Sequence, residues 1–268
     1  MEQVNWFEKA ALIPSLPKVA LDLIETFKEE EPNLRRLAQN IDADAVLSAR
    51  ILRLANTPYY ATARKIKTVS EALMILGFSP VRNIALSTAV SSLGSAKKGP
   101  EMDRFASLSL LSAMCCESLA AEAGLEKGQA FAAGLLRPIG MLLMRAAKPV
   151  EIASLDLATS VFDPRRAEEE VKMFGVDHGA LSGALATRWN LPEGIAQALG
   201  EGGKPAAAAK LGQWAASREL SGPGNAEMFN SFEPAAKWAE ELGIGEDFAT
   251  RAFPDMEAAK NRFGVLAG

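Results

Sequence analysis

Apolar residues recur at helical spacing almost from one end of this 268-residue chain to the other. β-branched runs that alternate with polar residues and are bounded by turn residues are absent from the sequence. A period near 3.6 residues predicts helices with one buried face, whereas a period of 2 would predict strands. The chain is therefore predicted to be all-α, and its 49% of hydrophobic side chains suffices for a substantial core.

Capping residues divide this pattern into separate helices. Asn33 is a predicted cap, and Thr68 with Glu71 forms a Thr-x-x-Glu capping box. Gly77 follows where a helix-ending residue that tolerates positive φ is expected. Asp177 stands at another predicted helix start.

Two apolar stretches rich in Ala, Leu and Met, about 103–123 and about 127–147, are predicted to be core helices. Pro138 lacks a backbone N–H within the second stretch, so a kink or a helix break is expected there. The GSAKKGP segment at 94–100 is the clearest linker-like sequence, and we place a boundary between two sub-lobes there.

Composition restricts the partners and the location. The formal net charge is −4 and the sequence pI is about 5.3, so no strong overall positive field exists to attract nucleic acid or an anionic membrane. Cys115 and Cys116 are adjacent on a predicted helix and point in different directions, which favours reduced thiols and a cytoplasmic location. No segment approaches the ~18 to 20 uninterrupted apolar residues that span a bilayer, so neither export nor membrane insertion is predicted.

Four segments, in order, resemble the HDOD domain found in many bacterial regulatory proteins, over residues of about 12–203. They are IPSLPKVALDLIE, then IDADAVLSARILRLANTPYY followed by TVSEALMILGFSPVRNIAL, then AFAAGLLRPIGMLL, and last FGVDHGALSGALATRWNLPEGIAQAL. The resemblance implies a multi-helix HDOD-type fold with an N-terminal helical sub-lobe, an HD-like core and extra C-terminal helices. We expect a domain over 1–203, with sub-lobes of about 1–95 and 100–203, and a helical extension over 204–268.

The departures from the enzymatic HD phosphohydrolase pattern concern its metal site. The resemblance places Leu108 at the first metal-binding histidine, Arg137-Pro138 at the histidine–aspartate doublet, and Glu201 where many relatives carry consecutive histidines. The whole chain has one histidine, and a centre of this kind needs several imidazoles at defined spacing. Neither a metal nor another cofactor is expected, and without metal ions the hydrolytic mechanism is lost.

His178 and Arg137 are the candidate pocket residues. No GxSxG, P-loop or GxGxxG motif accompanies His178, so a capping or packing role is favoured over a general base. Arg137 lies in an apolar run, and two hypotheses remain open for it. In the first, Arg137 is buried in the former metal pocket and paired with an acid such as Asp177 or Glu117. In the second, its side chain extends to solvent.

Residues 44–95 contain six basic and two acidic side chains, although acids are in excess elsewhere. Arg50 and Arg53 share one side of a predicted helix, which Asn56, Tyr59 and Tyr60 follow. Scattered basic residues most often form a simple solvated face, and the functional alternative is a docking face for an acidic partner, a nucleotide or nucleic acid. Nucleic acid is disfavoured because few exposed aromatic residues are interleaved with the basic ones.

Three functional hypotheses follow. The first, which the HDOD resemblance implies for a chain lacking metal ligands, is a non-enzymatic regulatory module that contacts an unidentified signalling protein in trans. The second is a receptor for a small ligand, such as a nucleotide or cyclic dinucleotide, that uses a pocket at Arg137, His178 and Asp177. The third, a residual phosphodiesterase, is disfavoured.

Overall fold

The computed structural model describes residues 6, 7, 16, 18–26, 29, 33–57, 64–92, 100–200, 202–245 and 247. Within these residues all regular secondary structure is helical, which confirms the all-α prediction. Contacts divide the chain into two compact units. The N-terminal unit comprises the described residues between 16 and 102, and the central unit comprises residues 6 and 7 and those from 103 onward.

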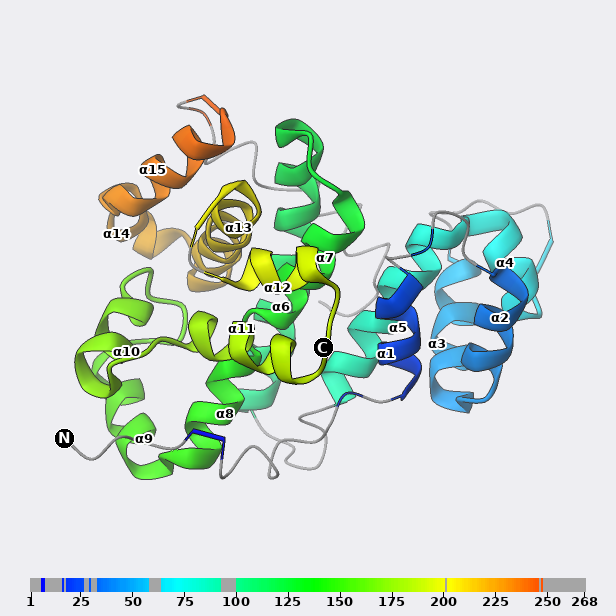
Figure 1. The fold of residues 1–268 in the computed structure, drawn as a ribbon, viewed down its shortest axis with the longest axis horizontal. Coiled ribbons are helices and arrows are strands. Elements are labelled where there is room, and N and C mark those ends of the chain that lie inside the picture. Colours follow the sequence, from blue (N-terminus) through cyan, green and yellow to red (C-terminus); the bar gives the residue numbers. More distant parts are fainter. Residues whose placement is uncertain are drawn as a thin grey trace. The chain divides into compact units, whose positions relative to one another are not determined.

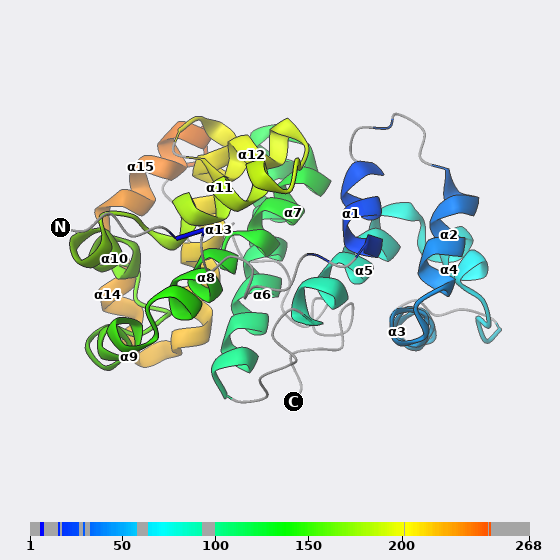
Figure 2. The same ribbon diagram turned by 60° about the horizontal axis from the view of Figure 1, so that its bottom comes forward.

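In the described part of the N-terminal unit there are five helices, and α4 packs against its neighbours α2, α3 and α5 (Figure 2). Leu23, Ile41 and Ile51 contribute fully buried side chains from the first three helices. The helices are α1 (Lys18–Glu25), α2 (Leu34–Asp42), α3 (Ala45–Ala55), α4 (Val69–Leu76) and α5 (Phe78–Ser92).

The predicted helix caps are present in the N-terminal unit. The side chain of Asn33 accepts a hydrogen bond from the backbone N–H of Arg36, which caps α2. Thr68 Oγ1 accepts one from the N–H of Glu71 at 3.1 Å. The Glu71 carboxylate accepts one in turn from the N–H of Lys67, one residue before the cap, at 2.8 Å. These bonds satisfy N–H groups that have no partner within the helix.

The central unit contains the remaining helices, in which α11 packs against α8 and α12, and α13 packs against α7 and α12 (Figure 1). A short 3-10 helix, Pro223–Asn225, precedes α14. The α-helices are α6 (Pro100–Ala123), α7 (Lys127–Leu136), α8 (Ile139–Ala147), α9 (Pro149–Ala158), α10 (Arg166–Phe174), α11 (His178–Arg188), α12 (Glu193–Leu199), α13 (Lys204–Ser221), α14 (Ala226–Asn230) and α15 (Glu233–Leu242).

The predicted break at Pro138 is present, because α7 ends at Leu136 and α8 begins at Ile139. Ser182 of α11 satisfies backbone groups at this break. Its hydroxyl lies 2.6 Å from the carbonyl oxygen of Arg137 and accepts a hydrogen bond from the N–H of Gly140 at 2.8 Å. Gly140 lacks a side chain where a Cβ would overlap the His178 carbonyl, so α8 and α11 approach closely.

Close contacts also position α13 against the two core helices. A Cβ on Gly134 of α7 or on Gly212 of α13 would collide with the Cys116 sulfur of α6. The Cys116 thiol lies 3.4 Å from the carbonyl oxygen of Ala208, also on α13. Small residues therefore let α6, α7 and α13 pack at short range, and this packing fixes the position of α13, which lines the cavity described below.

The helices after residue 203 belong to the central unit by their contacts. Trp214 of α13 stacks edge-on against Phe229 of α14, with ring centroids 6.0 Å apart, and Phe232 meets Trp238 of α15 in the same way at 5.9 Å. The division into a domain over 1–203 and an extension over 204–268 remains a prediction. The linker-like residues 94–99 lie outside the described residues, whereas the contact boundary falls at 102–103.

Two helical stretches, 102–123 and 127–147, are long and apolar enough to cross a bilayer by length and composition. Their most apolar windows are 67% and 72% buried within the protein. Such burial is typical of core helices in soluble proteins, and the break at Arg137-Pro138 interrupts the second stretch.

Candidate functional site

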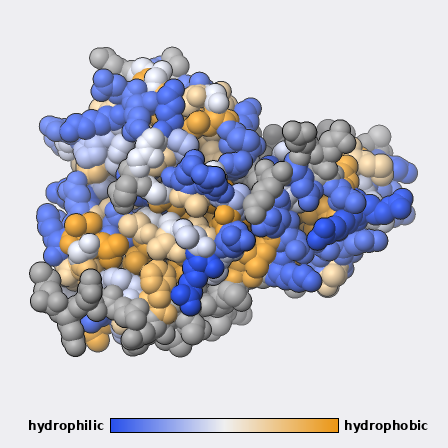
Figure 3. Space-filling model, in the orientation of Figure 1, coloured by the Kyte–Doolittle hydropathy of each residue, from blue (hydrophilic) through white to orange (hydrophobic). Residues whose placement is uncertain are grey.

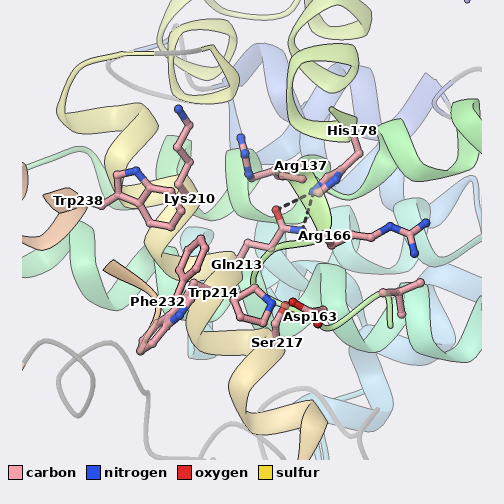
Figure 4. A pocket seen from close by; sticks show the side chains of 13 residues that line it. Arg137, Asp163, Arg166, His178, Lys210, Gln213, Trp214, Ser217, Phe232 and Trp238 are labelled. Atoms are coloured by element: carbon pink, nitrogen blue, oxygen red, sulfur yellow. Dashed lines mark hydrogen bonds between the residues drawn. The ribbon is translucent and has the colours of Figure 1, made fainter. Parts of the chain in front are cut away.

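A cavity of about 50 Å³ opens in the central unit (Figure 4). It lies between the α7–α8 junction, α13, and two aromatic residues, Phe232 just before α15 and Trp238 within it. Its charged lining residues are Arg137, Arg166, Lys210 and Asp163. The others are His178, Gln213, Ser217, Trp214, Phe232, Trp238, Val161, Pro164 and Ala167. Two of the three predicted pocket residues, Arg137 and His178, thus line one cavity, whereas Asp177 does not.

Arg137 is buried, with only 5% of its surface exposed, so the hypothesis that its side chain extends to solvent is wrong. Its guanidinium lies directly over Gly179 in the first turn of α11, where a Cβ would come within 2.6 Å of the guanidinium carbon. Asp177 instead caps α11, since its Oδ1 accepts a hydrogen bond from the N–H of Ala180 at 2.7 Å. The pairing of Arg137 with Asp177 or Glu117 stays a prediction.

Both ring nitrogens of His178 are engaged by buried side chains. Nδ1 lies 2.6 Å from Glu170 Oε2, and the same oxygen accepts the backbone N–H of His178 at 2.8 Å. On the other side of the ring, Nε2 lies 2.8 Å from Nε2 and 3.2 Å from Oε1 of Gln213 (Figure 4). A neutral ring that donates from Nδ1 accepts the Gln213 amide proton, while a protonated ring donates to the Gln213 oxygen.

His178 stands at one end of a chain of charges that is buried at Glu170 and Arg166 and half-buried at Asp156 and Arg145. Arg166 Nε donates to Glu170 Oε1 at 2.9 Å, and Arg166 Nη1 lies 2.8 Å from Asp156 Oδ1 and donates to the carbonyl of Thr159. Arg145 Nη2 reaches the other oxygen of Asp156 at 2.6 Å. The chain therefore ties α8, α9, α10 and α11 together by alternating charges.

Glu170 is fully buried within this chain. Burial by itself raises the pKa of its carboxyl group, because a low dielectric disfavours the charged form. The charge and hydrogen bond of His178, the charge of Arg166 and the backbone N–H of His178 outweigh burial and lower the pKa to about 2 from an ordinary 4.5. The carboxylate is thus held ionised by its partners.

The positions that the resemblance assigns to the HD metal ligands carry side chains that do not suit a metal ion. Leu108 is buried with 1% exposure and offers no donor atom, and Arg137 presents a guanidinium, which cannot ligate a cation. Pro138 has no side-chain donor, and Glu201 lies outside the described residues. Across the described ranges, no group of three or more His, Cys, Asp or Glu side chains is placed to hold a metal.

The predicted docking residues lie in the N-terminal unit, apart from Tyr59 and Tyr60, which lie outside the described residues. Arg53 is exposed and Arg50 is half-buried on α3. Burial, followed by the charge of Arg53, lowers the pKa of the Arg50 guanidinium, as expected for two like charges one turn apart.

Asn56 is a clamp within the N-terminal unit. Its Nδ2 donates to the carbonyls of Leu52 at 2.7 Å and Ile66 at 2.9 Å, and its Oδ1 accepts the N–H of Ile66 at 2.8 Å. The exposed side chains of Lys65 and Lys67 are thereby held near the end of α3, which carries Arg53. The Asn56 amide is occupied by these internal hydrogen bonds. Its predicted contact with a partner stays a prediction.

Glu170, Gln213 and Lys210 belong to the site although no pattern in the sequence marks them as site residues. Arg166 and Glu170 are four apart, a spacing that signals a helical ion pair. It does not signal burial of that pair. Gln213 lies 35 residues after His178, and no local pattern connects the two.

Solved structures share this fold. One is an HDOD domain protein with unknown function from Geobacter sulfurreducens, with a TM-score of 0.73 and 22% identity over 97% of this chain and 95% of that one. Another is a candidate phosphohydrolase from Shewanella amazonensis, with a TM-score of 0.71 and 22% identity over 98% of both chains. A third is a candidate signal transduction protein from Marinobacter aquaeolei, with a TM-score of 0.69 and 19% identity over 97% of this chain and 60% of that one.

Curated relatives match over part of their length. The uncharacterized protein YuxH of Bacillus subtilis is 29% identical over 99 residues, which cover 37% of this chain and 24% of YuxH. An uncharacterized protein of Treponema pallidum is 24% identical over 197 residues, which cover 68% of this chain and 36% of that protein. The matches thus span about a quarter and a third of these relatives.

The described residues thus form an all-α protein whose candidate site is held together by buried hydrogen bonds and ion pairs. The model of the HDOD domain family matches residues 13–204. The chain belongs to the HDOD domain family.

Proposed function

We propose that this HDOD protein is a regulatory module that acts by binding another signalling protein and does not catalyse a reaction. The observation that supports this most directly is the state of the one histidine in the chain. His178 is buried, and Glu170 and Gln213 occupy its two ring nitrogens. A general base or a metal ligand needs a ring nitrogen directed at its target, so this imidazole is built to hold helices together.

A basic face on the N-terminal unit suits an acidic partner. We define the basic face as the side chains of Arg50, Arg53, Arg64, Lys65 and Lys67. Glu71 is the acid beside it, with its carboxylate 3.5 Å from Arg64. Hydrophilic residues cover most of the described surface of this unit seen in Figure 3. Clustered exposed charges favour fast, salt-dependent association with a surface of opposite charge.

An exposed apolar side of α9 gives further support for a contact function. Val150 and Leu157 are 77% and 92% exposed, and residues seven apart lie on the same side of a helix. Large apolar side chains that stay exposed together often mark interaction surfaces.

The docking proposal is tested by charge reversal. Arg53→Glu/Lys65→Glu changes two exposed residues of the basic face, and Lys204→Glu/Lys237→Glu changes two exposed lysines of the central unit by the same net charge. Proteins cross-linked to the chain in its native cells are identified by mass spectrometry. We expect an acidic partner that is lost with the first variant, is kept with the second, and binds more weakly as salt rises. Retention of every cross-linked protein by the first variant contradicts the docking face.

The absence of catalysis is tested separately. Purified protein is analysed for transition metals and assayed with bis(4-nitrophenyl) phosphate, with and without added Mn²⁺. We expect neither stoichiometric metal nor hydrolysis above that of a His178→Gln variant. Hydrolysis by the wild type that this variant lacks contradicts the proposal.

A further inference from the structure

The charged residues that line the cavity are mostly cations. Arg137, Arg166 and Lys210 are basic, and Asp163 is the acidic lining residue. The charge of Asp163 is paired with that of Arg165. Its two oxygens each lie 3.1 Å from the Arg165 guanidinium, and one of them also accepts the Arg165 backbone N–H. Arg166 belongs to the buried chain with Glu170 and Asp156. The lining therefore favours a negatively charged ligand.

Arg137 and Lys210 reach the cavity from different elements. Arg137 comes from the α7–α8 junction, and its guanidinium is supported by the flat backbone of Gly179. Lys210 lies on α13, three and four residues before Gln213 and Trp214, so the three side chains share one face of that helix. Figure 4 shows the nitrogen-bearing ends of Lys210 and Arg137 on the same side of Gln213.

Aromatic rings form another part of the lining. Trp214, Phe232 and Trp238 line the cavity there, and the Ser217 hydroxyl adds a neutral donor from α13. Apolar walls exclude water and lower the local dielectric, so a charge inside interacts more strongly with the nearby cations than it would at an open surface.

We propose that the cavity binds a small oxyanion, of the phosphate or sulfate class, between the Arg137 guanidinium and the Lys210 ammonium group. A guanidinium presents parallel N–H donors that match two oxygens of such an ion, and an ammonium group adds a point charge from the other side. A volume of about 50 Å³ is far below the roughly 300–1,000 Å³ of pockets that enclose drug-sized ligands. A nucleotide would have to leave its sugar and base outside.

This site is independent of the proposed basic face, which lies in the other unit. Failure of one proposal therefore leaves the other intact.

The probe is sodium phosphate, titrated while Tm is followed, with sodium chloride at equal ionic strength as the reference. A ligand that binds the folded state raises Tm in a concentration-dependent way. We expect a saturating rise with phosphate that chloride does not produce. Lys210→Met should weaken the apparent affinity at least tenfold, and Lys204→Met, an exposed lysine at the start of the same helix, should leave it unchanged. No rise beyond chloride, or an equal rise in Lys210→Met, overturns the proposal.

Two further arms complete the test. Trp214 and Trp238 line the cavity, so phosphate should change the intrinsic fluorescence of the wild type and of a Trp189→Phe variant, but change it much less in Trp238→Phe. Unchanged phosphate-dependent fluorescence in Trp238→Phe overturns the location. Guanosine and guanosine monophosphate are compared with phosphate to identify the source of the oxyanion. Tighter binding of the monophosphate that depends on Lys210 assigns the oxyanion to a nucleotide, equal binding assigns it to the free ion, and binding of guanosine alone contradicts an oxyanion site.

Discussion

One carboxylate oxygen of Glu170 contacts both the imidazole Nδ1 of His178, at 2.6 Å, and the backbone N–H of the same residue, at 2.8 Å. The side chain and the main chain of His178 are thus fixed by a single acceptor. This arrangement locks the start of α11 onto α10. His178, which would be the natural candidate for chemistry in a chain with one histidine, is part of the framework.

Replacement of Glu170 by glutamine should destabilise the protein by about 3 kcal/mol, because it leaves Arg166 and His178 buried without their carboxylate. The free energy of unfolding is measured in urea. Glu169→Gln is the matched control on the same helix, where the exposed pair with Lys172 contributes at most about 1 kcal/mol. Equal losses in the two variants would show that the buried chain does not stabilise the fold.

Stability should fall in acid through Glu170. Its pKa is about 2 in the folded protein and 4.5 when unperturbed, so the unfolded state binds the proton first as pH decreases. The stabilisation is complete above about pH 4.5 and is lost between pH 4.5 and 2, to an extent of about 3 kcal/mol. Unfolding in urea at stepped pH checks this, and Glu170→Gln should show a flatter dependence. Parallel pH profiles for wild type and variant would contradict it.

Two glycines that pack near the α7–α8 junction, Gly140 and Gly179, should respond differently to replacement by alanine. The Cβ of Gly140→Ala would overlap the backbone carbonyl of His178, which cannot move without separating α8 from α11. The Cβ of Gly179→Ala meets the end of the flexible Arg137 side chain. We expect a loss of about 3 kcal/mol or more for the first and about 1 kcal/mol for the second, measured by urea unfolding. A loss for Gly179→Ala that equals or exceeds the loss for Gly140→Ala would show that the Arg137 guanidinium is rigidly held.

Asn56→Ala should cost about 2 kcal/mol, because it leaves the N–H and carbonyl of Ile66 without their side-chain partner. Asn33→Ala, which removes a cap at an exposed helix start, is the comparison and should cost about 1 kcal/mol. Hydrogen exchange at the Ile66 amide reports the local effect. Unchanged protection of that amide in Asn56→Ala would contradict the clamp.

Neither cysteine should react in the native protein. Both thiols are fully buried, and burial raises the pKa of Cys115 well above its usual range and that of Cys116 to about 12, although Arg137 offsets part of the effect at Cys116. Only the thiolate is an efficient nucleophile. Iodoacetamide at pH 8 should label neither residue until urea is added, as followed by mass spectrometry. Rapid labelling of one cysteine under native conditions would indicate local opening of α6.

Local features of the sequence determined the helices and most of their ends. Thr68, Gly77 and Asp177 act on backbone groups within a few residues, so their effect does not depend on the rest of the chain. Pro138 breaks the core helix for the same reason. The family was also evident from the order of its segments, and the match over residues 13–204 confirms it.

Tertiary structure decided what the charged residues do. Whether Arg137 was buried or exposed was open in the sequence, and it is buried because α11 presents Gly179 to it. Gln213 meets His178 only because small residues let α13 pack close to the core helices. A cap depends on neighbours in the chain, but the environment of a charge depends on which distant helices surround it, and that is set by the packing of the whole unit.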